Sequence, residues 1–195
     1  MRAATTERID DHARADLRFV REAMARSAQF SAVPGWGGIA MGVIAVAAAW
    51  IAHRQATPQT WLAVWLVTAV LGFAVGVATL VHKASRHGVD LTRQPARGFA
   101  LSLLPPLVAG ALLTPALVLA GVYDLLPGLW LLLYGTAVVT GGAYSVRAIP
   151  LMGVAIAGIG AAALALPRLG DLAMAAGFGG LQIGFGIFVA RRYGG

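Results

Sequence analysis

Long runs of apolar residues alternate with short polar stretches over most of this chain of 195 residues. A helix needs about 20 consecutive apolar residues to cross the hydrocarbon core of a bilayer. Six runs are close to that length, and they predict membrane-spanning helices at 34–53, 61–82, 98–121, 128–146, 149–166 and 172–190. The period-two alternation of barrel strands is absent, and an unbroken helix satisfies its own backbone in lipid. The sequence therefore predicts an all-α integral membrane protein with six transmembrane helices.

Residues 1–32 differ from the rest of the chain because they are polar and rich in charge. Apolar residues recur there at helical spacing, with arginines beside them: Ile9, Ala13, Leu17, Val20 and Met24 form the stripe. The pattern predicts an amphipathic helix and an entry turn, followed by a transmembrane domain at 33–195. Such a helix can lie on the membrane surface, dock against a partner or a neighbouring protomer, or simply lead into the first span. A polar segment of this length is not typical of a cleavable signal peptide.

The basic residues predict the orientation of the bundle. An even number of spans places both termini on one side, and thirteen of the fifteen lysines and arginines lie there: Arg2, Arg8, Arg14, Arg18, Arg21, Arg26, Lys83, Arg86, Arg93, Arg97, Arg147, Arg191 and Arg192. Only Arg54 and Arg168 lie on the other side. By the positive-inside rule, both termini and the amphipathic helix are cytoplasmic. The formal net charge of +7 then indicates attraction to anionic lipids on the cytoplasmic face, without a nucleic-acid partner.

Glycines at four-residue spacing are the clearest local motif. They form three pairs on the first, second and last predicted spans: Gly38–Gly42, Gly72–Gly76 and Gly180–Gly184. Glycine lets helix backbones approach closely in lipid, where the hydrophobic effect does not drive helix association. The pairs either pack the bundle internally or build an oligomer interface, and the pair in the last span is the preferred candidate for an interface. Trp61 and Trp65 are expected at the outer headgroup level, where tryptophan is enriched.

Polar residues inside the predicted spans give one candidate ligand site. Thr140, Tyr144 and Arg147 are at helical spacing near one end of the fourth span, and together they could bind a phosphate or carboxylate of a lipid or small anion. Alternatively, Arg147 anchors the topology by extending its side chain to the interface. Gln182 is a second candidate ligand-binding residue, and its ordinary role is an interhelical hydrogen bond, for which Thr68 and Thr140 are candidate partners.

The third span contains prolines that bear on function. Pro105, Pro106 and Pro115 lack backbone N–H groups, so they are expected to interrupt the ladder of hydrogen bonds along the helix. A broken helix exposes carbonyl groups at membrane depth, and transporters often place a substrate or ion there. A kink that serves only packing is the alternative.

Side chains that could carry out catalysis or bind a metal are scarce. The sequence therefore predicts no catalytic residues, no metal site and no cofactor. The chain contains no cysteine, and no Asp or Glu lies inside a predicted span. Coupled carriers and acid–base enzymes in membranes usually need an intramembrane carboxylate. His82 and His87 are five residues apart, which is off the spacing of two metal ligands on one helix face.

Several stretches resemble small six-span proteins of bacterial inner membranes, a group without an assigned activity. They are the entry at 32–37 (AVPGWG), the stretch 127–135 (PGLWLLLYG) and the stretch 141–145 (GGAYS). The resemblance implies a location in the bacterial inner (plasma) membrane and no particular functional residues. We expect a non-enzymatic protein that acts through association, as a scaffold, sensor or accessory subunit, with itself or with a protein partner. The alternative is a transporter or channel for small solutes, anions or lipids.

Overall fold

The computed structural model describes residues 34–86, 92 and 96–193, and the predicted amphipathic helix lies outside this part of the chain. All of its regular elements are helical: α2 (Gly35–Ala52), α3 (Pro58–Arg86), α4 (Ala96–Leu119), η1 (Tyr123–Leu125), α5 (Leu126–Gly142), α6 (Ala148–Ala165), η2 (Pro167–Leu169), α7 (Gly170–Met174), η3 (Ala175–Leu181) and α8 (Gln182–Tyr193). Within the described residues, six helices are long and apolar enough to cross a membrane, and the last of them, Pro167–Arg192, comprises η2, α7, η3 and most of α8. The prediction of six helices of membrane-spanning length and composition is confirmed.

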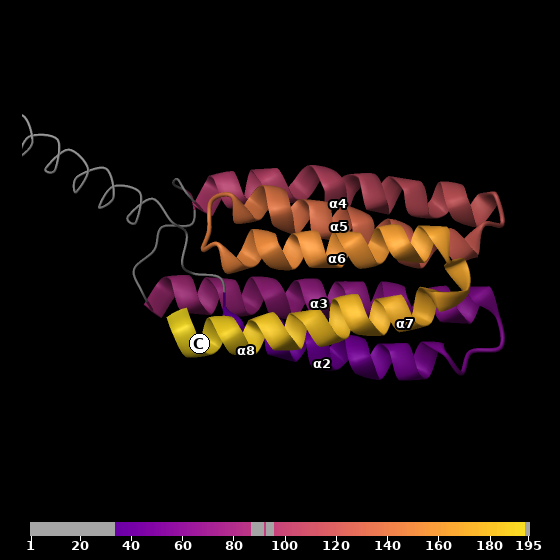
Figure 1. Cartoon of the computed structure of the whole chain (residues 1–195), viewed down its shortest axis with the longest axis horizontal. Coiled ribbons are helices and arrows are strands. Elements are labelled where there is room, and N and C mark those ends of the chain that lie inside the picture. Colours follow the sequence, from indigo (N-terminus) through magenta and orange to yellow (C-terminus); the bar gives the residue numbers. More distant parts are fainter. Residues whose placement is uncertain (1–33, 87–91, 93–95, 194–195) are drawn as a thin grey trace, which may run out of the picture.

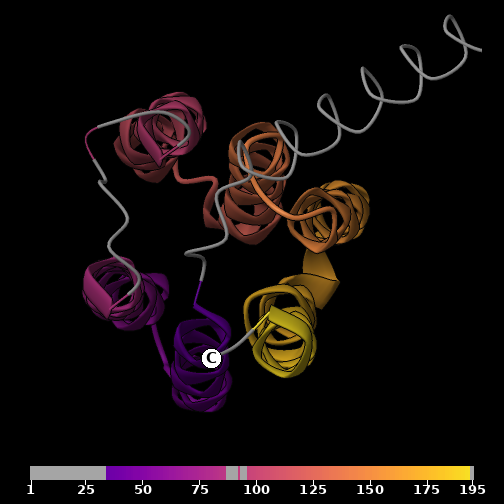
Figure 2. The same ribbon diagram turned by 90° about the vertical axis from the view of Figure 1, so that its left-hand side faces the viewer.

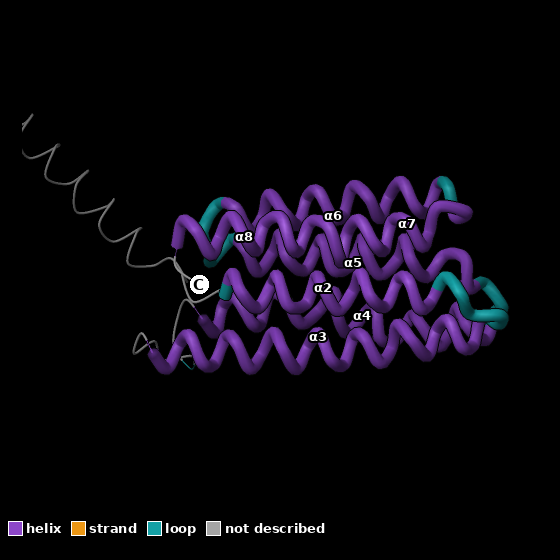
Figure 3. Tube along the Cα trace, turned by 90° about the horizontal axis from the view of Figure 1, so that it is seen from below, coloured by secondary structure: helices purple, strands orange, loops and turns teal. Residues whose placement is uncertain are grey.

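The six long helices run side by side, and their connections lie at the two ends of the bundle (Figures 1 and 3). One end carries the α2–α3, α4–α5 and α6–α7 connections. The other end carries the α5–α6 turn and the last turn of α8, which contains Arg191 and Arg192. Arg147, the residue before α6, lies at that second end. The described basic residues are therefore divided unequally between the two ends, as the sequence predicts.

Viewed along the bundle, the helices form a ring that is unevenly packed (Figure 2). The helix α2 packs against α3 on one side and against η3 and α8 on the other, while α5 packs against α4 and α6. The helices α3 and α4 do not pack along each other's length. α3 buries only Trp65, Lys83 and Ala84, and α4 buries only Ala96, Gly98, Gly110 and Thr114. Both helices therefore leave most of their surface outside the described bundle.

Glycines spaced seven residues apart hold the two tightest helix pairs together. In the α5–α6 hairpin these are Gly128, Gly135 and Gly142 on α5, and Gly153 and Gly160 on α6. A Cβ on any of them would lie within 3 Å of the facing helix. Seven residues are close to two helical turns, so the glycines of each helix lie on one narrow face. The hairpin therefore packs backbone against backbone.

Glycines spaced seven residues apart also pack α2 against the last span. A Cβ on Gly42 would lie 2.9 Å from the carbonyl oxygen of Gly179, and one on Gly186 would lie 2.9 Å from that of Gly35. Every residue that α2 buries is glycine or alanine. Dispersion between closely apposed atoms is a main source of attraction between helices in lipid, and small residues allow it.

Two features of the helices differ from the predictions. α4 is a continuous helix through Pro105, Pro106 and Pro115, so the third span is not broken, although each proline still removes one backbone hydrogen-bond donor. Thr114, the residue before Pro115, donates a hydrogen bond of 2.7 Å from its side chain to the carbonyl oxygen of Gly110 in the same helix. The irregular span is instead the last one, in which η3 is a π-helix of seven residues. Glycine makes up much of this segment, and a π turn is wider than an α turn.

Candidate functional site

A groove lies between α6 and the last span at the end of the bundle that holds Arg147 and Arg192. It has a volume of about 550 Å³, and its lining residues are Arg147, Ala148, Leu151, Gly180, Leu181, Gly184, Phe185, Phe188 and Arg192. All of them except the two arginines are apolar. Around the bundle the last span lies next to α6 (Figure 2), and a Cβ on Gly184 would meet no atom within 4 Å. The groove therefore combines an apolar floor with two cationic groups at one end.

The two arginines reach the groove from different elements. Arg147 precedes the first residue of α6, and no side chain caps that helix terminus by a hydrogen bond. Arg192 lies in the last turn of α8, and its Cζ is 5.9 Å from the centroid of the Phe188 ring. Both side chains are exposed. Within the described residues, neither forms an ion pair with an acid.

The structure does not assemble the predicted set of Thr140, Tyr144 and Arg147. α5 ends at Gly142, so Tyr144 and Arg147 lie in the following turn and the helical spacing does not apply to them. Thr140 faces α4, because its Oγ1 donates a hydrogen bond of 2.9 Å to the carbonyl oxygen of Ser102. Arg147 lines the groove beside the last span instead. The helix therefore ends at Gly142, about one turn earlier than its apolar length suggests.

Gln182 is buried, with 5% of its surface exposed, and its hydrogen-bond partner is Tyr134. The Nε2 of Gln182 donates to the Tyr134 hydroxyl over 2.6 Å, and this bond joins the last span to α5. The expected partners were wrong. Thr68 donates to Val64 of its own helix, and Thr140 donates to α4 and to its own helix. Gln182 therefore contributes to packing and does not line the groove.

The three predicted glycine pairs have different surroundings. Gly38 and Gly42 pack inside the bundle against the last span. A Cβ on Gly76 would lie 3.2 Å from the sulfur of Met41, whereas one on Gly72 would meet no atom within 4 Å. Gly180 and Gly184 are exposed in the groove, and a Cβ on Gly184 would also meet no atom within 4 Å. One pair therefore packs the bundle, while Gly72 and the last pair remain open to other molecules.

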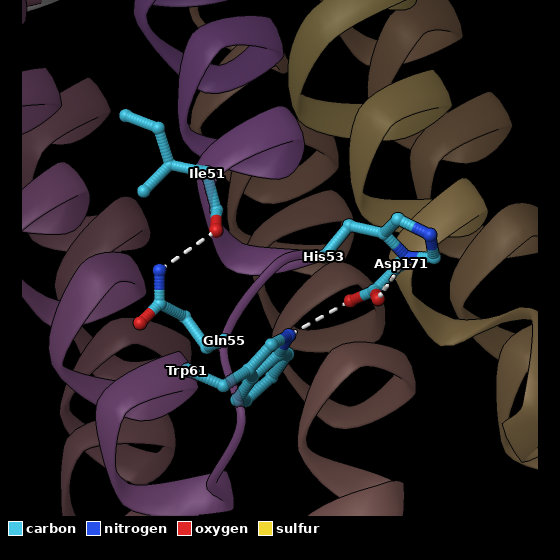
Figure 4. A network of polar contacts seen from close by, with 5 residues as sticks. All are labelled: Ile51, His53, Gln55, Trp61 and Asp171. Carbon is cyan, nitrogen blue, oxygen red and sulfur yellow. Dashed lines mark hydrogen bonds and ion pairs between the residues drawn. The ribbon is translucent and has the colours of Figure 1, made fainter.

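A polar network occupies the opposite end of the bundle (Figure 4). Asp171, in the first turn of α7, accepts a hydrogen bond of 2.7 Å from the indole Nε1 of Trp61. Its other carboxylate oxygen lies 3.3 Å from Nδ1 of His53, at the end of α2. Gln55 donates to the carbonyl oxygen of Ile51 over 2.9 Å. These contacts join the ends of α2, α3 and the last span.

Aromatic rings continue this network into the bundle. Trp61 stacks on Trp130 of α5, with their ring centroids 5.8 Å apart, and Trp65 lies 6.4 Å from Phe178 of η3. Trp130 donates a hydrogen bond of 2.9 Å to Thr114 on α4. Trp61 and Trp65 thus pack inward, and only 4% of the surface of Trp65 is exposed. The indole N–H of Trp65 has no hydrogen-bond partner in the described part of the chain.

Sequence reasoning missed this cluster because its members come from distant segments. A usable signal was Asp171 itself, since a carboxylate next to an apolar span calls for a nearby donor. Among the residues that the structure describes, no group of three or more histidines or acidic residues could hold a metal ion. Compared with known protein families, curated proteins and solved structures, the chain matches none of them. Function is therefore inferred from the residues of this chain.

Proposed function

We propose that this chain is a non-enzymatic membrane component that acts through association, as a scaffold, sensor or accessory subunit, and that its α3–α4 side receives a protein helix. The observation that carries the proposal is the sparse packing of α3 and α4, which are consecutive in the sequence and do not pack along each other. A Cβ on Gly72 of α3 would meet no atom within 4 Å, and Gly72 is partly exposed. A glycine in an open helix face lets a second backbone approach closely.

A second copy of this chain or another membrane protein would cover the α3–α4 side. A cytoplasmic location of the termini and a bacterial inner membrane are part of the same proposal.

The transporter or channel alternative has less support. It rested on a broken third span and on one polar face ending at Arg147. α4 is continuous, and Thr140 and Arg147 contact different elements. The association proposal does not depend on either feature.

A photo-reactive amino acid placed at Gly72 tests the proposal directly in native membranes. A matched control places it at Val43, an exposed apolar position on α2. Position 72 should form a protein adduct of defined mass, either a dimer or a complex with one partner, and position 43 should not. Protein adducts at neither position, with lipid adducts at both, would contradict association through the α3–α4 side.

A further inference from the structure

We propose that the groove between α6 and α8 binds an anionic phospholipid, with the phosphate between Arg147 and Arg192 and an acyl chain along the apolar floor. The groove is the part of the described surface where two cationic side chains meet an apolar hollow of about 550 Å³. This site is separate from the α3–α4 side, so the two proposals stand or fall independently.

The length of the groove matches one leaflet of a bilayer. Gly180, Gly184, Phe188 and Arg192 follow at four-residue intervals and all line it, so the groove runs along one face of the last span. Twelve residues of helix rise roughly 18 Å. Half of a hydrocarbon core is about 15 Å thick. A chain whose headgroup is held at Arg192 can therefore follow the groove as far as Gly180 without leaving its leaflet.

The charge of the groove selects the headgroup. Guanidinium groups bind phosphate oxygens through paired hydrogen bonds, and Arg147 and Arg192 have no acidic partner within the described residues. The N-terminal end of α6, beside Arg147, adds a positive partial charge. The acidic residues that the structure describes, Asp124 and Asp171, lie at the other end of the bundle.

The same charges argue against a second copy of the chain in this groove. A two-fold contact brings the same surface patch of both subunits together. Arg147 and Arg192 of one copy would then lie near those of the other, and like charges placed together oppose binding. A phosphate relieves this repulsion, and its acyl chain covers Phe185 and Leu151.

Native mass spectrometry of the full chain, exchanged into phosphatidylglycerol or into phosphatidylcholine, tests the proposal. The wild-type chain should retain phosphatidylglycerol as a defined adduct and retain phosphatidylcholine weakly. The double variant Arg147→Gln/Arg192→Gln should retain the anionic lipid at least about tenfold less, the usual scale for a lost charge-assisted hydrogen bond. Arg191→Gln is the matched control, since Arg191 is adjacent in sequence and exposed but does not line the groove.

Gly184→Leu provides a second variant that keeps both arginines. Its side chain points into open space, so it should fill the groove, leave the melting temperature in phosphatidylcholine unchanged, and reduce the anionic adduct as the double variant does. Wild-type adduct levels in both variants would overturn the proposal. An equal loss in Arg191→Gln would show diffuse charge attraction instead of a site. Full competition by glycerol phosphate would show a soluble-anion site, and a changed oligomer size in Gly184→Leu with the lipid adduct retained would show a protein interface.

Discussion

Replacing Gly160 by alanine should destabilise the bundle, although alanine is the better helix former. Gly160 lies on the face of α6 that packs against α5, and a Cβ there would lie 2.9 Å from the carbonyl oxygen of Gly128 and 2.9 Å from the carbonyl carbon of Leu131. Backbone atoms cannot move aside as a side chain can, so the two helices must separate. Overpacking of this kind costs about 1–3 kcal/mol.

Gly158 on the same helix is the matched control. A Cβ on Gly158 would meet no atom within 4 Å, so its replacement by alanine adds only helix propensity. That gain is about 0.5–1 kcal/mol for a glycine inside a helix. The same substitution, glycine to alanine, should therefore lower the stability of the protein at position 160 and raise it at position 158.

Thermal unfolding in a mild detergent, followed by the loss of monodisperse protein, measures the difference. At about 2–4 °C per kcal/mol for a chain of this size, Gly160→Ala should lower the Tm by roughly 2–12 °C. Gly158→Ala should leave the Tm unchanged or raise it by up to about 4 °C. If the two variants have the same Tm, the close backbone packing of α5 and α6 does not stabilise this hairpin.

The remaining predictions concern the buried hydrogen bond and the topology. Tyr134→Phe or Gln182→Leu alone should each lower stability, because one buried partner is left unsatisfied. The double variant should lose less than their sum by about 0.5–2 kcal/mol, and an additive double-mutant cycle in chemical unfolding would contradict the bond. The chain has no cysteine, so Ala143→Cys and Ala56→Cys each give one labelling site, at opposite ends of the bundle. In sealed right-side-out vesicles an impermeant maleimide should label position 56 and not position 143, and the reverse pattern would contradict cytoplasmic termini.

The number of spans could be predicted from the sequence because apolar length alone determines whether a helix can cross a bilayer. The ends of α5 show the limit of that reasoning, since the apolar run continues to Val146 but the helix stops at Gly142. Apolar length counts residues and does not show that the chain turns after Gly142, over residues 143–147. The separation of Thr140 from Arg147 follows from this one local event.

The packing of the glycines could be predicted only in part. Four-residue spacing identified Gly38 and Gly42, which do pack, but it also selected Gly180 and Gly184, which do not. Seven-residue spacing identifies the packed glycines of α5 and α6, and this spacing can be read directly from the sequence. The π-helix changes the face on which each glycine of the last span lies, and no pattern in the sequence signals this change.

The two helix pairs packed through glycines, α5–α6 and α2–α8, can form at very different times during synthesis of the chain. α5 and α6 are joined by a short turn, so their hairpin can close as soon as both segments have left the ribosome. α2 is among the first segments to enter the membrane, but its partner α8 ends roughly 140 residues later. At about 5–20 residues per second, the small-residue face of α2 waits roughly 7–28 s for its partner. During that interval it is open to mispairing, and a chaperone or insertase that shields it would set the yield of the folded protein.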